Sequence, residues 1–600
     1  MKTSQHWMRN CASAIALLLS AAAVAAAPPK ADTLYQNGYV YTVDAHDSVQ
    51  QAIATRDGRI VYVGDNHGAQ ALVGASTKVV DLHGRMLMPG LIDGHMHPMM
   101  GGAQLLACNL NYEALTIAQF QSRIQACLDQ QKGKDDSQWL MVVNWFQQSM
   151  LPQGTEATRA TLDALPTARP VIVLSSFGHS TLANTRALQL AHIDRTTPNP
   201  AAGSITRDAS GEATGILEDL AQDLVVKLLP APTATENLAA AAAALAALRE
   251  QGVTSFLDAM AERDGLLAFT TLQQQGKLTA RAHFAPRIPP EDGPQAGKAV
   301  ADVVALARQF DQGAIKPSPS VTLRNAKLFM DGVIAAPALT GSMVEPYFVD
   351  QGTPQQPHWV PGTSRGPATY FPPKVLQALL LGLCKAGLDP HIHVDGDGAV
   401  HETLDALRVM RAAPGCKGVR PALAHDEIVV PDDFGRFAEL NATAVLSLQW
   451  GKPAPDTVAG LKTYLGPQRY AILEPQELLL KAGTRIAYGS DWPVDPLNEW
   501  FALKVGVTRT NAPEAGPEFA GKLGPQNGLP RAAALRAITM NSAYTLRQES
   551  QTGSLEVGKL ADLIVLDRNF FTIDAEDIAN IKVLQTMVGG KVVYQSQDFD

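Results

Sequence analysis

A regular alternation of short apolar segments with helical segments runs through the middle of the chain and constrains its fold most strongly. The eight predicted strands are PGLIDGHMH (89–97), GVTSFLDA (252–259), ARAHFAP (280–286), AKLFMDG (326–332), LDPHIHV (388–394), PALAHD (421–426), TAVLSLQ (443–449) and TRIAYGSD (484–491). Segments such as KVLQALLLGLCKAG (374–387) predict the helices between them. Strands that alternate with helices pair in parallel, so eight units predict an α/β fold with a (β/α)8 TIM-like barrel. A doubly wound open sheet is the alternative.

Short alternating segments at both ends of the chain predict a second domain. The pattern of residues 33–88 predicts short strands with glycine-containing turns, and residues 553–595 have the same alternation of apolar and polar residues. We expect residues 31–88 and 550–600 to form one composite β-sandwich domain, with the barrel over 89–549. About 150 residues separate the first two barrel strands, too many for a simple loop, so 100–245 is predicted to be an inserted subdomain.

The N-terminus resembles a secretory signal peptide. Lys2 and Arg9 precede the apolar run CASAIALLLSAAAVAAA (11–27), which ends in small residues. We expect cleavage near Ala27, a periplasmic or secreted mature protein and no stable membrane span after cleavage. A membrane anchor is the alternative, but this run is short and rich in alanine.

Composition restricts the partners and the cysteine chemistry. The 600 residues are 46% apolar and 18% charged with a net charge of −9, which favours a large core and argues against nucleic-acid binding. Four cysteines follow the signal peptide without C-x-x-C spacing, so a disulfide scaffold is not predicted. Bridges between Cys108 and Cys127, or between Cys384 and Cys416, stay open.

Polar residues at the ends of the predicted strands point to a metal site. Active sites of such barrels lie at the carboxyl ends of the strands, where these side chains converge. Imidazole and carboxylate groups bind zinc and similar divalent ions, and four histidines are too many for one hydrolytic zinc with an open position. Two ions are therefore predicted. The residues are His95, His97, Lys327, His391, His393, His425 and Asp491.

Each residue of this set also has an ordinary interpretation. A strand-end histidine is often only hydrogen-bonded, and Lys327 can pair with a carboxylate such as Asp331. Burial beside Leu328 and Phe329 should instead lower the pKa of Lys327 and leave a neutral, nucleophilic amine. Asp491 is the predicted general base, because a carboxylate beside an activated water can take its proton and pass it to the leaving group.

Five motifs together resemble the amidohydrolase superfamily, and within it the amidohydrolase 3 group of YtcJ-like proteins. The resemblance covers nearly the whole chain after the signal peptide. The motifs are PGLIDGHMH (89–97), KLFMDG (327–332), HVDGDGA (393–399), GSDWPV (489–494) and GSLEVGKLADLIVLD (553–567). The strand-one H-x-H pattern alone is weak, whereas the set is specific.

The resemblance implies a role for each residue. His95 and His97 would hold the more buried ion, together with Asp491, and His393 and His425 would hold the second. Lys327 would bridge the two ions after carboxylation by carbon dioxide, as in several relatives. His391 shares a strand face with His393 and is either a supporting residue or an alternative ligand.

Two further residues are predicted to contact substrate. FGHSTLANTRAL (177–188) resembles a family segment that lines the pocket, so His179 is expected to contact the substrate or a developing oxyanion. Trp492 follows the predicted base and is expected to form a wall of the pocket. A structural role is the alternative for both.

These observations predict an exported, zinc-dependent hydrolase of a C–N bond, of the amide, N-acyl or N-formyl type, acting on a small molecule. An esterase, lactonase or phosphoesterase on the same barrel is the first alternative, and a catalytically dead metal- or ligand-binding protein is the second. GTSRG (362–366) matches the serine-hydrolase pattern, but its proline-rich surroundings argue against a nucleophilic Ser364. The oligomeric state is not predicted.

Overall fold

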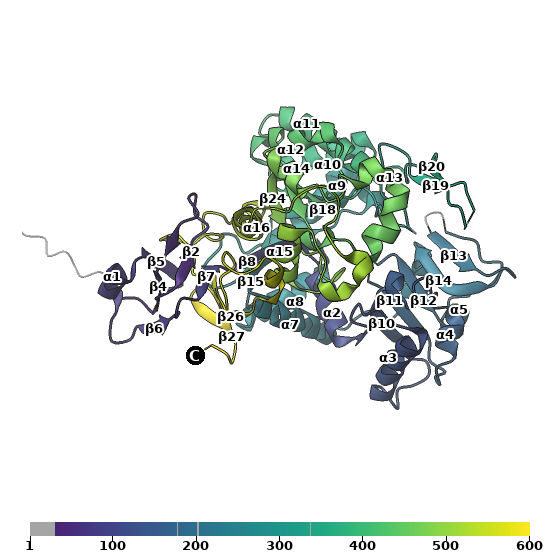
Figure 1. The fold of residues 1–600 in the computed structure, drawn as a ribbon, viewed down its shortest axis with the longest axis horizontal. Helices are drawn as coiled ribbons and strands as arrows, with labels where there is room; N and C mark the ends of the chain where they lie inside the picture. Colours follow the sequence, from purple (N-terminus) through teal and green to yellow (C-terminus); the bar gives the residue numbers. More distant parts are fainter. Residues whose placement is uncertain (1–29, 177, 201–202, 337, 354, 600) are drawn as a thin grey trace, which may run out of the picture.

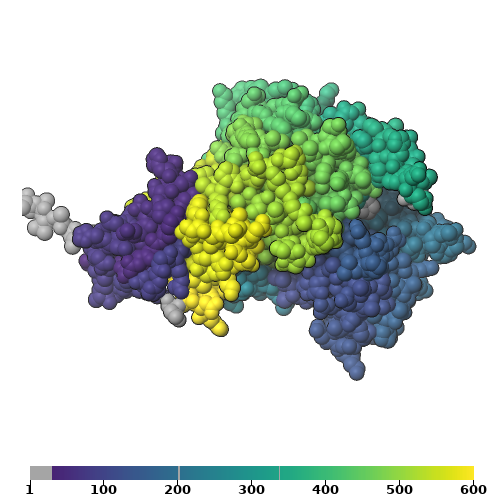
Figure 2. Space-filling model, viewed as in Figure 1, coloured from purple at the N-terminus to yellow at the C-terminus, as the bar shows by residue number. Residues whose placement is uncertain are grey.

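The computed structural model describes residues 30–599 except 177, 201–202, 337 and 354, so the predicted signal peptide (1–27) lies outside the described residues. The molecule is elongated, with three parts in a row (Figure 1). Residues 30–89 and 563–595 lie side by side at one end, the helix-covered strands lie in the middle, and the sheet between residues 108 and 219 forms the other end. The space-filling view in Figure 2 shows the same order.

The middle part has the parallel strand order of a TIM-barrel-type fold. The strands form two arcs, β17-β16-β15-β8 and β18-β21-β22-β23-β24, with every neighbouring pair parallel. β18 corresponds to the predicted fourth strand, and a short strand just before it that was not predicted, β17, closes the first arc. The strands are β8 (Leu91–Met96), β15 (Val253–Ala261), β16 (Arg281–Pro286), β17 (Val321–Leu323), β18 (Asn325–Phe329), β21 (Asp389–Val394), β22 (Ala422–His425), β23 (Thr443–Leu446) and β24 (Arg485–Tyr488).

Close backbone contacts join the two arcs on both sides. A parallel bridge between Arg287 and Lys327 connects the end of β16 to β18. On the other side β24 lies against β8, and glycine permits the approach. A Cβ atom added to Gly94 would lie 2.8 Å from the Tyr488 carbonyl oxygen, and one added to Gly489 would lie 2.4 Å from the Cβ of His95. These contacts bring strand one and strand eight together at the predicted site.

Helices with one apolar face cover the strands. α7 (Ala234–Gln251) begins at a capping box formed by Thr233 and Glu236 and ends at Gly252, whose φ of 88° suits glycine. α10 (Pro373–Ala386) buries four leucines at helical spacing, Leu376, Leu379, Leu380 and Leu383. Other helices of this layer are α8 (Arg263–Gln274), α9 (Ala296–Phe310), α11 (Asp397–Ala412) and α15 (Glu499–Thr508).

The two chain ends share one sheet. β7 (Met86–Pro89) pairs in parallel with β2 (Tyr39–Tyr41) and antiparallel with β25 (Leu563–Leu566), within the six-stranded order β27-β26-β25-β7-β2-β3. A second sheet has the order β5-β4-β1-β6, and apolar residues of both sheets form one core. The remaining strands are β1 (Thr33–Gln36), β3 (Val49–Gln50), β4 (Ala52–Arg56), β5 (Arg59–Gly64), β6 (Lys78–Asp81), β26 (Val583–Val588) and β27 (Lys591–Gln595).

The segment between β8 and β15 contains a sheet of its own, in the order β13-β14-β12-β11-β10-β9. A disulfide between Cys108 and Cys127 ties β9 to α3 (Ile117–Gln130), and a second joins Cys384 and Cys416. Both bridges that the sequence left open are thus formed. The strands are β9 (Cys108–Asn109), β10 (Leu140–Trp145), β11 (Val171–Ser175), β12 (Ser180–Ala183), β13 (Gly203–Arg207) and β14 (Ala213–Asp219).

A helix that crosses a membrane needs a long, continuously apolar stretch. Within the described part of the chain, none of the helices is long and apolar enough to do so.

A buried ion pair joins the strands of the middle part to the sheet of the chain ends. The Arg281 guanidinium donates to both carboxylate oxygens of Asp562 at 2.6 and 2.9 Å, and both side chains are almost fully buried. Asp562 also accepts the backbone N–H of Gly589. Arg281 therefore holds the C-terminal sheet against β16.

We expect Asp562→Asn to lower the melting temperature in scanning calorimetry, because removing one partner of a buried pair leaves an unpaired charge and costs about 3–5 kcal/mol. Asp302→Asn is the matched control, because the Lys298–Asp302 pair is exposed and its loss should leave the melting temperature unchanged. Equal melting temperatures for Asp562→Asn and wild type would contradict the assignment.

Candidate metal centre

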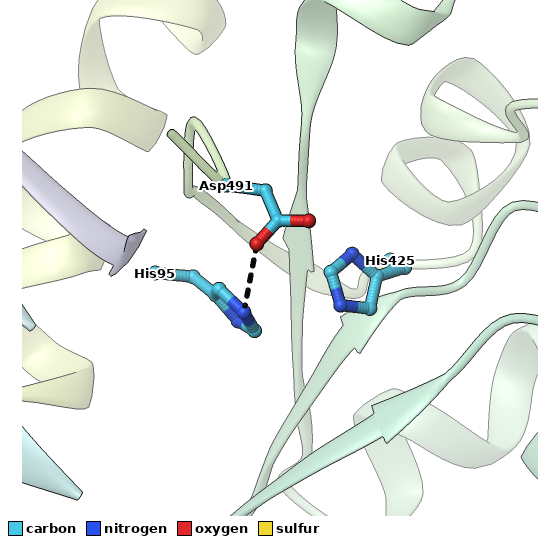
Figure 3. A group of neighbouring side chains, drawn as sticks. All are labelled: His95, His425 and Asp491. Atoms are coloured by element: carbon cyan, nitrogen blue, oxygen red, sulfur yellow. Dashed lines mark ion pairs between the residues drawn. The ribbon is translucent and has the colours of Figure 1, made fainter. Parts of the chain in front are cut away.

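Three predicted residues from different strands converge at the carboxyl ends of the strands (Figure 3). His95 is on β8, His425 ends β22, and Asp491 follows β24. One ligand atom from each lies within 4.8 Å of the others, and all three side chains are buried. Two imidazole nitrogens and one carboxylate oxygen at this spacing can hold a divalent ion.

Asp491 is placed by a tight turn that returns to strand one. Its φ is 55°, in the left-handed region that aspartate tolerates better than most residues, and its N–H donates to the His95 carbonyl oxygen at 2.8 Å. The Oδ1 atom then lies 3.0 Å from His97 Nε2 and 3.4 Å from His95 Nε2. Both histidines of the H-x-H motif therefore face one carboxylate oxygen, as their spacing on a strand predicts.

A second group, formed by His393, Asp395 and His425, also places one ligand atom of each residue within 4.8 Å of the others. His393 Nε2 lies 3.6 Å from Asp395 Oδ1, and the rings of His393 and His425 are 4.5 Å apart. His425 belongs to both groups. Asp395 was not predicted from the sequence, although it lies inside the quoted motif HVDGDGA, two residues after the predicted ligand.

Lys327 lies between the two groups. Its Nζ is 3.3 Å from His95 Nε2, and its side chain is fully buried. Burial lowers the pKa of Lys327 to about 7, while the carboxylates of Asp491 and Asp395 act in the opposite direction. A substantial fraction of this amine is therefore neutral at physiological pH, as the sequence predicted from its apolar neighbours.

His391 holds the imidazole ring of His95 in place. Its Nε2 lies 2.8 Å from His95 Nδ1, on the ring side away from the contact of His95 with Asp491. The other ring nitrogen of a metal-binding histidine is commonly held in this way, which fixes the ring orientation. Of the two roles that the sequence left open, this contact favours the supporting one.

The protonation states suit a divalent ion. Burial, followed by the charge of Lys327, holds the pKa of His95 and His391 well below the usual value, and burial and then His393 do the same for His425. Burial raises the pKa of Asp491, but the contact with His97 and other nearby positive groups outweigh it, so its pKa lies below the usual value. The site thus presents neutral imidazoles and an ionised carboxylate.

Unpartnered polar atoms also fit an ion. His425 Nδ1 and Asp395 Oδ1 are buried and have no hydrogen-bond partner among the described residues. Buried polar atoms without partners are rare in folded proteins, and a bound metal ion satisfies atoms of this kind. The donor set therefore fits the metal that these residue types predict.

His179 approaches this region from the inserted sheet. It precedes β12, and its Nδ1 lies 2.8 Å from Asp219 Oδ1 at the end of β14. Burial and then the charge of Lys327 lower the pKa of His393 to about 3, and the charge of His179 contributes in the same direction. His179 is thus close enough to the second group to influence it electrostatically, and the contact with substrate stays a prediction.

Trp492 packs mainly against the first helix after strand one. A Cβ added to Gly101 of α2 (Pro98–Leu106) would lie 2.5 Å from the Trp492 ring, and the Trp492 carbonyl oxygen accepts the N–H of His97. Trp492 also lines a cleft of about 270 Å³ between α2 and the inserted sheet. These contacts give it a structural role, and its predicted contact with substrate is untested.

Two aromatic residues flank the second group, and of these Trp450 was not predicted from the sequence. Trp450 stacks on His425 with ring centres 5.4 Å apart, and its Nε1 donates to Asp495. Phe329 lies 4.9 Å from the His393 ring. Trp450 follows β23, so its position after a predicted strand could have marked it as a candidate site residue. Ser364 is exposed, in a loop between β20 (Trp359–Pro361) and α10.

Comparison with known proteins identifies the family. The sequence profile described as "Amidohydrolase family" matches residues 78–594. The chain belongs to the amidohydrolase family. An N-substituted formamide deformylase of Arthrobacter pascens is 26% identical, over 94% of this chain and 98% of that protein. YtcJ of Bacillus subtilis (strain 168) is 25% identical, over 94% and 99%.

Solved structures agree on the fold of this amidohydrolase. A crystal structure of an uncharacterized metal-dependent hydrolase from Pyrococcus horikoshii OT3 has a TM-score of 0.69 and 22% identity, covering 90% of this chain and 99% of that one. At this sequence identity the structural similarity supports the TIM-barrel-type fold and nothing further. The divalent metal follows from the family together with the two groups of ligand atoms.

We expect zinc to raise the melting temperature of the chelator-treated amidohydrolase, because a ligand that binds only the folded state stabilises it by about 4 kcal/mol at a thousandfold excess over its Kd. His425→Ala should remove most of this shift, since His425 belongs to both groups. His401→Ala is the control, because His401 pairs with Asp433 on the outer side of α11 and belongs to neither group. If zinc does not change the melting temperature of the wild-type protein, the metal site is contradicted.

Proposed function

We propose that this protein hydrolyses a C–N bond of an amide, N-acyl or N-formyl type in a small molecule, with Asp491 as the general base. The observation that most supports this is the ionised Asp491 carboxylate, whose Oδ1 lies against His95 and His97 and opposite His425. The name of the Arthrobacter relative, a deformylase of N-substituted formamides, belongs to the same reaction class.

In this proposal the residues hold two ions, with zinc the default from the ligand types. His95, His97 and Asp491 would hold one, His393 and His425 would hold the other, and a carboxylated Lys327 would supply a further anionic ligand. The contact of Nζ with His95 Nε2 and the pKa of about 7 support the carboxylation, because carbon dioxide reacts with the neutral amine. When bound, such ions activate water and polarise the substrate carbonyl group.

Asp491 then moves the proton. Its carboxylate accepts a proton from the attacking water and passes it to the nitrogen of the leaving amine, which departs as a neutral group. The contact with His97 keeps the carboxylate oriented between these two events. Burial of the site strengthens each of these electrostatic interactions, because the effective dielectric is lower than in water.

The alternatives use the same constellation of residues. A metal-activated water can attack an ester, a lactone or a phosphoester as well as an amide, so these hydrolases stay alternatives. A dead binding protein is disfavoured by the presence of Asp491 with its surrounding histidines.

We also propose that the mature protein is periplasmic or secreted. The apolar run at 11–27 supports export, and the two disulfides support an oxidising compartment, since disulfides are rare where thiols are kept reduced.

We expect Asp491→Asn to lower kcat/KM for N-formyl and N-acyl amines by about 10²- to 10⁴-fold, because the amide side chain cannot accept the proton. The measurement is release of the amine from a panel of amides and of the alcohol from their matched esters, with the metal content of each variant measured in parallel. Full activity in Asp491→Asn would remove it as the base, and preferred cleavage of the esters would support the alternative hydrolase.

His179 is proposed to contact the substrate carbonyl oxygen, oriented by Asp219. The two residues are joined twice, since His179 Nδ1 meets Asp219 Oδ1 and the Asp219 N–H donates to the His179 carbonyl oxygen at 2.8 Å. Because His179 Nδ1 contacts Asp219, Nε2 is the ring nitrogen of His179 that can contact the substrate.

His179→Ala should reduce kcat/KM by about 10²-fold, the loss expected for one donor to a developing oxyanion. Asp219→Asn should reduce it less, and should have no further effect in a His179→Ala background if it acts through His179. The adjacent Glu218→Gln, whose carboxylate accepts from Ser180, is the control. Additive losses in the double variant would show that Asp219 does not act through His179.

A further inference from the structure

Asp395 has the geometry of a metal ligand and lies two residues after His393, inside HVDGDGA (393–399). Its Oδ1 is 3.6 Å from His393 Nε2, and it shares a 4.8 Å group with one ligand atom each of His393 and His425. Its side chain is almost fully buried and Oδ1 has no hydrogen-bond partner in the described part of the chain.

The backbone around Asp395 is held rigidly. The Asp331 carboxylate accepts the N–H groups of Asp395, Gly396 and Ser342 at 3.0, 2.9 and 2.9 Å. Gly396 allows the close approach of this loop, because an added Cβ would lie 2.1 Å from the Ser342 carbonyl oxygen. Asp331 therefore acts as a clamp that fixes where the Asp395 side chain begins.

Asp395 differs in its partners from two neighbouring buried carboxylates. Asp331 accepts three N–H groups, and Asp397 accepts the N–H of Val344 at 2.7 Å. Asp395 instead faces the histidines and the carboxyl group of Glu427. A bound cation would give Asp395 Oδ1 the partner that it lacks among the described residues.

We propose that Asp395 is the third protein ligand of the ion held by His393 and His425. Two imidazoles and one carboxylate form a common ligand set of hydrolytic zinc sites, and they leave a position open. The second ion would then have its own anionic ligand whether or not Lys327 is carboxylated. The inference rests on the proposed two-ion site, and it concerns how the second ion is held.

The first experiment measures zinc per chain by elemental analysis after dialysis against limiting free zinc. Wild type should retain about two ions per chain and Asp395→Asn about one, because an isosteric amide is a much weaker zinc ligand. Asp426→Asn is the matched control. Asp426 is equally buried, also lacks a hydrogen-bond partner in the described residues, and follows His425, but it belongs to neither group of ligand atoms. It should retain the wild-type content.

A second experiment observes the ligand directly. Asp395→Cys places a thiolate donor at the same position, and loading with cobalt(II) should produce a near-ultraviolet thiolate-to-cobalt charge-transfer band that Asp426→Cys lacks. The other cysteines of the described chain are paired in disulfides and do not interfere. The band requires only that the cobalt-loaded chain be folded, which circular dichroism verifies.

The outcomes separate this inference from the proposed function. Loss of one ion in Asp395→Asn together with the cobalt band in Asp395→Cys supports the inference. A wild-type content of two ions in Asp395→Asn, or a folded Asp395→Cys without the band, overturns it and leaves the proposed function standing. Wild-type protein without divalent metal after zinc loading overturns both. If Asp395→Asn fails to fold, the cobalt spectrum of Asp395→Cys decides.

Discussion

The contact between strand one and strand eight is the interaction on which the site depends. Two backbone hydrogen bonds cross this seam, from Asp491 N–H to the His95 carbonyl oxygen at 2.8 Å and from His97 N–H to the Trp492 carbonyl oxygen at 2.7 Å. They bracket the residues whose side chains meet around Asp491 Oδ1. Because Gly94 and Gly489 allow the strands to approach, the contact that joins the two arcs of strands also assembles the first group of ligand atoms.

Burial then determines what those atoms can do. An imidazole or an amine in an apolar surrounding loses its proton more readily, which lowers the pKa of Lys327 and of three histidines, His95, His391 and His425. A carboxylate in the same surrounding would normally gain a proton, and Asp491 avoids this through its contact with His97. Burial alone would favour the protonated, neutral form of an isolated carboxyl group. In this site Asp491 stays ionised beside neutral donors, and this combination can bind a divalent ion and accept a proton.

The sequence predicted the residues whose positions follow from strand periodicity. An i, i+2 pair on a strand shares one face, and strand ends meet at one edge, so His95, His97, His425 and Asp491 could be placed together without coordinates. The short strand β17 before the fourth strand was not predicted, because VTL (321–323) is only three residues long and is followed directly by the polar Arg324 and Asn325.

Contacts set by tertiary structure were not predictable. The pairing of His179 with Asp219 depends on the register of two strands that are far apart in the chain, and the stacking of Trp450 on His425 depends on the turn after β23. Asp395 could not be placed from the motif HVDGDGA alone, because the Asp331 clamp that fixes its backbone is a tertiary contact. The result is a site with two unlike sides, imidazoles around Asp491 and carboxyl groups around His393.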